Sequence, residues 1–199
     1  MKHPPGPAEF RDPGFPARIR AKEPAAIRTV VHEYLPHILR AARGAGLNQE
    51  RADDTTQEVF KTFIETAERF EGRSHVRTWI FGILYHKISE QRRAAQREEK
   101  GDDIDEMMES RFDERGMWGR PPAHSDADAY AAEIRRHIED CMEPLNENQR
   151  LAFVLREVEG FESEEICKTL DVTRTNLGVL LYRARNALRE CLELKDVGR

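Results

Sequence analysis

The fold is decided by seven consecutive residues in the first third of the chain, Asp54-Thr55-Thr56-Gln57-Glu58-Val59-Phe60. They lie in a pattern that predicts a helix from about residue 50 to residue 69. Acidic, amide and basic side chains recur on one side of this helix, whereas apolar side chains cover the other side. The apolar side must be buried. The polar side suits a basic partner surface, although a solvated helix face has the same pattern.

The composition of the 199-residue chain favours small helical domains. Charged residues make up 35% and aromatic residues only 8%, so a β-sandwich is not indicated. The net charge of −5 argues against nucleic-acid binding, but acidic and basic residues occur in separate blocks. No apolar run reaches the ~18 residues of a membrane span, and no secretory signal is evident. We therefore expect a cytoplasmic protein without membrane insertion.

The three cysteines, Cys141, Cys167 and Cys191, are odd in number and have no CxxC spacing. This pattern predicts neither a disulfide framework nor a zinc module, and it favours inert packing for Cys141 and Cys167. His137 and Cys141 are one helical turn apart, but two ligands do not make a metal site. The sequence contains no nucleophile–base pairing and no glycine-rich phosphate loop. We therefore expect no enzyme activity, no metal and no cofactor.

Six prolines within residues 1–24 predict a flexible arm, because this segment has few large apolar groups to bury. From Ala25 onward, apolar residues recur at helical spacing as far as Gly44. Pro36 should kink this helix or split it in two. Asn48 is a candidate N-cap for the helix described above.

A basic block follows between residues 69 and 97, where there are seven basic residues and only two acidic residues. It begins with a predicted turn, Phe70–Ser74, and continues as a helix that the serine is expected to cap. Phe81, Tyr85 and His86 are predicted to be exposed beside the cations, offering phosphate contacts and stacking surfaces together. A solvated basic face beside a core tryptophan is the alternative interpretation.

Residues 98–128 then become strongly acidic and contain glycines and prolines, which predicts a linker. Trp118 either anchors this linker or belongs to a local cluster under a loop. The linker separates the basic block from the last third of the chain.

The last third predicts a second helical unit, residues 129–194. Asn146 followed by Gln149 resembles a capping box. A short helix, a three-residue turn and a longer helix from Arg174 then make a helix-turn-helix, whose second helix would place its first residues in a DNA major groove. A plain helical hairpin has the same pattern and stays open as an alternative.

Two sets of motifs together resemble the sigma-70 family of transcription initiation factors, in its extracytoplasmic-function (ECF) form. The first set resembles region 2 of that family and consists of Asp54-xx-Gln57-Glu58-Val59-Phe60, Phe70-x-Gly72-x-Ser74 and Thr78-Trp79-Ile80-Phe81. The second set resembles region 4 and consists of Leu155-Arg156-Glu157-Val158-Glu159-Gly160-Phe161 and Tyr182-Arg183-Ala184-Arg185.

The resemblance implies an all-α protein in which two small helical domains are joined by an acidic linker. The implied division is a flexible Pro-rich arm at 1–24, a region 2-like domain at 25–97, the linker at 98–128 and a region 4-like helix-turn-helix domain at 129–194.

The resemblance also implies roles for the residues that match the family motifs. The residues that would dock on the clamp helices of the RNA polymerase β′ subunit are Asp54, Gln57, Glu58 and Phe60. The residues that would read and melt the −10 promoter element, with an unstacked base beside Trp79 and Phe81, are Arg73, Ser74, Arg77, Trp79, Phe81, Tyr85, His86, Arg92 and Arg93. The residues that would contact the −35 element are Thr173, Arg174, Thr175, Asn176, Gly178, Arg183 and Arg185.

At two places the chain departs from the family pattern, and both bear on which promoter sequence it recognises. His86 and Glu90 stand where the family usually has Asn and Asp, so the −10 preference stays open. The start of the last helix, Thr175–Leu180, is less basic than usual, so the −35 sequence stays open as well. Asn176 is a candidate for a bidentate contact with adenine.

These features predict a promoter-specificity subunit that binds core RNA polymerase through the β′ clamp helices and the β flap. An anti-sigma factor is a further partner that the resemblance implies. The alternative is a sigma-like mimic that sequesters an anti-sigma factor without loading polymerase. The intact face of Asp54, Gln57 and Glu58 opposes the mimic, whereas the less basic start of the last helix favours it.

Overall fold

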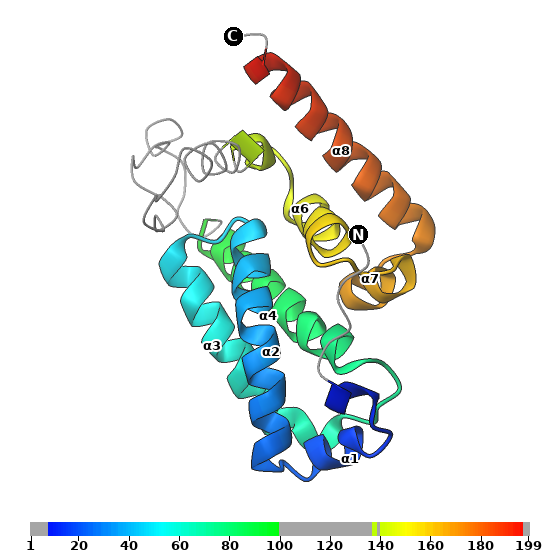
Figure 1. Cartoon of the computed structure of the whole chain (residues 1–199). Coiled ribbons are helices and arrows are strands. Elements are labelled where there is room, and N and C mark those ends of the chain that lie inside the picture. Colours follow the sequence, from blue (N-terminus) through cyan, green and yellow to red (C-terminus); the bar gives the residue numbers. More distant parts are fainter. Residues whose placement is uncertain (1–7, 100–136, 139, 197–199) are drawn as a thin grey trace, which may run out of the picture.

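The computed structural model describes residues 8–99, 137–138 and 140–196. Every regular element in these ranges is helical (Figure 1). The predicted all-α fold is therefore confirmed. The predicted linker, 98–128, lies outside the described residues from position 100 onward, as does Trp118, so both stay predictions.

The first half of the molecule is built around three long helices that pack together (Figure 1), namely α2 (Pro24–Gly44), α3 (Gln49–Thr66) and α4 (Val76–Glu99). The apolar stripe of α3 is buried as predicted, with Val59 and Phe63 fully inaccessible to solvent. Asn48 caps α3, because its side chain accepts a hydrogen bond from the Arg51 N–H at 2.9 Å. A 3-10 turn, η2 (Ala67–Arg69), follows α3.

Pro36 lies inside α2, and the helix continues through it from residue 24 to residue 44. Of the two predicted effects of Pro36, the split into two helices is therefore wrong, whereas a kink within the continuous helix stays a prediction. Pro36 itself is exposed on the outer surface of the bundle, while Tyr34 and Ile38 on either side are buried.

Residues 8–24 are not a flexible arm, which corrects the prediction for that part of residues 1–24. They form η1 (Ala8–Arg11) and α1 (Phe15–Arg20), and α2 starts at Pro24. Phe15 and Ile19 are 2% and 0% exposed, so these two side chains attach the segment to the core. The prediction gave too much weight to the number of prolines and too little to these two residues.

Two polar contacts fix α1 and the following turn to the end of α3. Arg20 donates a hydrogen bond to the Phe70 carbonyl at 3.3 Å, and Lys22 forms an ion pair with Glu68 at 2.9 Å. Gly72 has a positive φ of 71°, and a Cβ at this position would lie 2.9 Å from the Pro16 Cβ. Glycine is therefore required where the 70–75 turn meets the N-terminal segment.

The second half contains helical residues at 137–142, with residue 139 not described, followed by α6 (Glu147–Phe153), η3 (Val154–Val158), α7 (Ser163–Leu170) and α8 (Arg174–Asp196). The predicted capping box at α6 is confirmed, since the side chains of Asn146 and Gln149 each accept a hydrogen bond from the other's backbone N–H. Asp171, with φ of 51°, ends α7 and begins the turn to α8.

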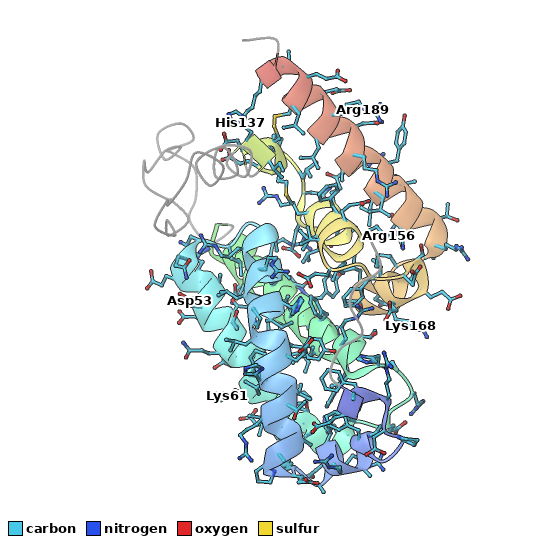
Figure 2. All side chains as sticks on the ribbon, in the orientation of Figure 1. Asp53, Lys61, His137, Arg156, Lys168 and Arg189 are labelled. Carbon is cyan, nitrogen blue, oxygen red and sulfur yellow. A yellow bond between two sulfur atoms is a disulfide. The ribbon has the colours of Figure 1, made fainter. Side chains whose placement is uncertain are left out.

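Cys141 and Cys191 form a disulfide, so the prediction of no disulfide and of inert packing for Cys141 is wrong (Figure 2). Their Cα atoms lie 5.6 Å apart, although 50 positions separate them in the sequence. The pairing depends on how α8 returns along residues 137–142, which neither the number nor the spacing of cysteines shows.

The two halves, residues 8–99 and 137–196, pack against each other and share one continuous apolar core. The main contact is between α4 and α7, which lie side by side in Figure 1. A Cβ at Gly44, the last residue of α2, would lie only 2.7 Å from a Val154 methyl group. The end of α2 can therefore approach η3 closely because it lacks a side chain at that point.

None of the helices in the described ranges has both the length and the apolar character needed to cross a membrane.

Candidate polymerase-binding and nucleic-acid-binding surfaces

The polar face of α3 is exposed, as predicted, at Asp54, Gln57 and Glu58. Glu58 lies 3.3 Å from Lys61 and 3.7 Å from Lys87, so its charge is partly balanced by its neighbours. Phe60, predicted with these residues, is only 7% exposed and belongs to the core. The residues available to a partner here are therefore the two carboxylates and the amide, with Phe60 supporting them from beneath.

A cavity of 440 Å³ lies between the N-terminal segment, residues 10–16, and the turn at residues 70–76. The ring of Phe10 forms part of its lining, stacked on Tyr34 with centroids 5.5 Å apart and edge-on to His75 at 5.7 Å. Arg11, Asp12 and Arg73 add charged groups. The cavity thus combines an aromatic surface with hydrogen-bonding groups.

His75 has a fixed ring orientation at the rim of this cavity. Its Nδ1 accepts a hydrogen bond from the Arg77 backbone N–H at 3.1 Å, at the start of α4 where Ser74 was the predicted cap. Burial lowers the pKa of His75, and the charge of Arg77 lowers it further. The ring is therefore neutral at pH 7 with its proton on Nε2, where it can donate a hydrogen bond.

Arg77, at the start of α4, is held by an acidic residue of the second half of the chain. Its guanidinium lies 2.8 Å and 3.0 Å from the two carboxylate oxygens of Glu165, and Thr78 donates to the same carboxylate at 3.4 Å. The guanidinium also lies 4.1 Å from the centre of the Phe161 ring, a cation–π distance. Arg77 is thus occupied on two sides.

The pKa of Glu165 lies below its ordinary value. Burial alone would raise this pKa, but hydrogen bonds from the Glu162 backbone N–H and from Arg77 outweigh the burial. The carboxylate is therefore ionised at neutral pH, and the contact between α4 and α7 contains a complete charge pair.

Phe81 is 1% exposed, so the prediction that its ring is accessible is wrong. The ring packs edge-on against Phe161, with centroids 4.9 Å apart. Trp79 instead stacks on Phe70 at 4.9 Å, with Phe63 nearby at 5.6 Å. The predicted pocket beside Trp79 and Phe81 does not form, because the two side chains have different neighbours.

The other residues predicted for the −10 element lie along α4 and its preceding turn. Tyr85 is half-buried beside the exposed His86, and Arg92 lies 3.9 Å from Glu147 of α6. The remaining members of the predicted set are Arg73, which is exposed and paired with Glu71, Ser74, which is half-buried, and Arg93, which is exposed.

A buried cluster between the two halves was missed from the sequence. Glu159 is 1% exposed and lies 2.6 Å from His37 and 3.3 Å from Arg40, both on α2. The sequence around Glu159 does not indicate that its side chain is buried, because its two partners lie more than one hundred residues earlier in the chain. This cluster is a second ionic contact holding the halves together.

The predicted helix-turn-helix is confirmed in α7, the turn at residues 171–173 and α8. Thr173 caps α8, because its hydroxyl accepts a hydrogen bond from the Asn176 N–H at 3.2 Å. Leu177, Leu180 and Leu181 are buried beneath α8. The residues predicted for the −35 element are all exposed, namely Thr173, Arg174, Thr175, Asn176, Gly178, Arg183 and Arg185.

An apolar groove of about 790 Å³ runs between residue 138, the end of α6 with η3, and the second half of α8. Phe153, Val158, Leu188 and Leu192 contribute apolar lining, and Glu157 with Arg185 forms an ion pair on its edge at 2.5 Å. The periodicity of the sequence predicted core positions at Leu188 and Leu192, but it did not predict that a solvent-accessible groove lies beside them.

The described residues contain no group of three or more His, Cys, Asp and Glu side chains arranged to hold a metal. Cys141, which the sequence placed one turn from His137, is bonded to Cys191 and is therefore not a free ligand.

Comparison with known families finds two matches in the order that the motifs predict. Residues 30–98 match the model for sigma-70 region 2, and residues 135–188 match that for sigma-70 region 4. A protein from Haemophilus influenzae named "Probable RNA polymerase sigma factor" is 34% identical over 152 residues, covering 72% of this chain and 78% of that protein. The chain belongs to the sigma-70 family. The ECF sigma-E factor of Escherichia coli is 26% identical over 135 residues, covering 68% of this chain and 70% of that protein, and identifies the ECF branch.

Two solved structures have the same fold as this sigma factor. The sigma factor RpoE of Bartonella quintana, solved with the anti-sigma factor NepR, has a TM-score of 0.64 at 21% identity and covers 83% of this chain and 96% of that chain. CnrH, solved with the cytosolic domain of CnrY, has a TM-score of 0.64 at 18% identity and covers 90% of this chain and 96% of that chain.

Family membership makes the chain a promoter-specificity subunit, whose partners are core RNA polymerase and promoter DNA. Sigma factors are transcription initiation factors. The named relatives are polymerase sigma factors, which favours this function over a mimic.

Proposed function

We propose that this sigma factor uses three surfaces in turn: the polar face of α3 for polymerase, the cavity and α4 for the −10 element, and the start of α8 for the −35 element. The observation that carries the proposal is the exposure of Asp54, Gln57 and Glu58 on α3 together with the predicted residues at the start of α8.

The polar face of α3 suits a basic surface of core polymerase, which we assign to the β′ clamp helices. Asp54 and Glu58 are exposed carboxylates one turn apart, and Gln57 between them offers both a donor and an acceptor. Complementary charge would speed association and fix the orientation of docking.

The cavity between residues 10–16 and 70–76 suits an unstacked base of the −10 element. Phe10 provides an aromatic surface, and the neutral His75 and Asp12 provide a donor and an acceptor. Stacking on an aromatic ring is worth about 1–3 kcal/mol per base, which offsets the few kcal/mol needed to unstack it.

The start of α8 suits the major groove of the −35 element. Arg174, Thr175 and Asn176 extend from the first turn of the helix into solvent. Asn is the residue best matched to the adenine edge, and the exposed Arg183 further along α8 is placed for phosphate contact.

The apolar groove on α8 suits a short apolar segment of the polymerase β flap. An anti-sigma factor, such as the one solved with the Bartonella quintana RpoE, would compete by covering this groove or the α3 face. We further propose that the chain acts as an initiation factor without catalytic activity of its own, in the cytoplasm, where polymerase and promoters are.

Full use of the residues predicted for the −10 element requires the two halves to separate. In the closed structure Glu165 balances the charge of Arg77, so Arg77 attracts a promoter phosphate only weakly, and Phe161 covers the ring of Phe81. We therefore infer that the closed structure loads onto polymerase and opens as the −10 element is engaged.

Run-off transcription with purified core polymerase, this protein and genomic DNA fragments tests the proposal. Transcripts starting at defined sites are expected, and those sites would reveal the promoter sequence. Absence of core binding, measured by co-elution in the same preparation, would contradict the proposal and favour the mimic.

A further inference from the structure

The disulfide between Cys141 and Cys191 lies apart from the main core. It belongs to a small cluster whose buried members are Cys141, Leu145, Ala184 and Leu188. The rest of the second half, including Leu177 and Leu181 of α8, is buried in the large core shared with the first half. The disulfide therefore stabilises the packing of one end of α8, whereas the large core does not depend on it.

The two sulfurs differ in access. Cys141 is 1% exposed, whereas Cys191 is half-buried on α8. A thiol reagent in solution can therefore approach the Cys191 sulfur more readily than that of Cys141. This asymmetry decides which sulfur is attacked first.

The bond also sets the distance between two walls of the apolar groove. Ile138 lies one turn before Cys141, Leu188 lies one turn before Cys191, and Leu192 follows it directly; all three line the groove. Linking the two cysteines holds these walls at a fixed spacing.

Other contacts between the same segments survive without the bond. Lys195 forms an ion pair with Asp140 at 2.7 Å, and Leu145 packs in the same cluster as Leu188. An exposed ion pair contributes only about 0–1 kcal/mol, so these contacts would hold the end of α8 loosely. Loss of the disulfide is therefore expected to loosen residues 137–142 and 186–196 while leaving the main core intact.

We propose that Cys141 and Cys191 are a reversible thiol–disulfide couple that sets the shape of the groove, and with it the affinity for core RNA polymerase. This inference rests on the proposed function, in which the groove receives an apolar segment of polymerase. Disulfides in reducing compartments are typically transient and redox-sensing, which is the behaviour expected at a site that the fold can open locally.

Breaking the Cys141–Cys191 bond requires a dithiol as reductant, and forming it again requires an oxidant such as hydrogen peroxide. A dithiol attacks the Cys191 sulfur, the bond to Cys141 breaks, and Cys141 takes up a proton as a thiol. The second thiol of the reductant then displaces Cys191, also released as a thiol, and the reductant leaves as a disulfide. In the reverse direction a hydrogen peroxide molecule accepts two electrons and two protons from the thiols and leaves as two water molecules.

The first test measures the couple in the full-length protein. We expect peroxide to form the bond and dithiothreitol to remove it, detected by acid quenching, alkylation and mass spectrometry. Hydrogen exchange should then become faster in the reduced form at 137–142 and 186–196, and stay unchanged at 177–184. A bond that never forms, or that persists in excess dithiothreitol, would overturn the proposal, as would global unfolding on reduction.

The second test measures affinity for purified core polymerase in both redox states. The oxidised protein is expected to bind at least several-fold more tightly, and the double variant Cys141→Ser, Cys191→Ser should bind like the reduced protein regardless of dithiothreitol. Cys167→Ser, which removes the free cysteine, is the matched control and should keep the full redox response. Equal binding in both states overturns this inference alone, whereas no binding in either state overturns the proposed function.

Discussion

The start of α8 and the start of α4 are both predicted to meet promoter DNA, yet the structure presents them differently. Arg174, Thr175 and Asn176 of α8 extend into solvent. Arg77 of α4 is bound by Glu165, and Phe81 is covered by Phe161. The residues that we propose for the −35 element are thus exposed, whereas Arg77 and Phe81, which were predicted for the −10 element, are held by the second half of the chain.

This difference shows that acidic side chains of the second half pair with arginines of α4. Glu165 lies 2.8 Å from Arg77, and Glu147 lies 3.9 Å from Arg92. In the function that we propose, these carboxylates compete with promoter phosphates for the two arginines. The polar face of α3 is not covered in this way, so the proposal predicts that polymerase docking and −10 recognition are separable steps.

The largest expected effect comes from reversing charge on the open α3 face. Asp54→Lys together with Glu58→Lys should abolish binding to core polymerase, because it replaces two carboxylates with two ammonium groups. Both side chains are exposed, so the free energy of unfolding should fall by only about 1 kcal/mol, mainly through loss of the surface ion pairs of Glu58 with Lys61 and Lys87. Glu164→Lys with Glu190→Lys makes the same charge change at exposed positions of α7 and α8, outside this face, and should keep polymerase binding. Wild-type affinity in the first variant, measured by fluorescence anisotropy, would contradict the docking assignment.

The next largest effect tests the open end of α8. Arg174→Ala and Asn176→Ala should each weaken binding of the −35 element by about 1–3 kcal/mol, the usual value of a good base contact. Because both residues are exposed, thermal stability should be unchanged. Glu193→Ala, at the far end of the same helix, serves as the control. Unchanged promoter binding would place the groove-reading helix elsewhere.

A smaller effect tests the covered end of α4. Glu165→Gln keeps an oxygen that can accept the hydrogen bond from the Glu162 backbone N–H but removes the charge opposite Arg77. The closed arrangement should lose about 1 kcal/mol, as for other partly exposed ion pairs. Glu164→Gln is the neighbouring control. Denaturant titration measures the loss, and small-angle scattering should show a larger average radius for Glu165→Gln.

The same contact has a defined pH dependence. The pKa of Glu165 lies below its ordinary value of 4.5, so its carboxylate stabilises the closed state above that pH, and the contribution is lost as pH falls through the lowered pKa. Acid opening that is identical in wild type and Glu165→Gln would contradict this assignment.

The smallest effect compares two glycines with open space around them. A Cβ added at Gly82 of α4 or at Gly178 of α8 meets no atom within 4 Å. Each Gly→Ala change should therefore stabilise its helix by about 0.5–1 kcal/mol, measured by denaturant titration. Only Gly178→Ala should also weaken −35 binding, because its methyl group would face the major groove. Equal effects of both variants on −35 binding would argue against that orientation.

Local patterns predicted the helices well because their signals are short-range. Asn48, Asn146 and Thr173 cap helices as their sequence positions suggest, and the turn at 171–173 separates two amphipathic segments. The exposure of the α3 face and of the start of α8 follows from the same periodicity.

The features that were missed depend on contacts between distant residues. Phe81 was predicted exposed because its own helix offers it no partner, and Phe161, eighty positions later, covers it. The six prolines at positions 4–24 suggested a flexible arm, but Phe15 and Ile19 are buried in the core and hold residues 8–24 in place. The disulfide likewise requires α8 to return to residues 137–142.

The attachment of α1 to the 70–75 turn also orders events during synthesis. Arg20 and the Phe70 carbonyl are 50 positions apart. At ribosomal speeds, the partner of Arg20 is made about 3–10 s after Arg20 itself. Until then Phe15 and Ile19 have no complete site, so these two apolar side chains stay exposed for seconds after they leave the ribosome.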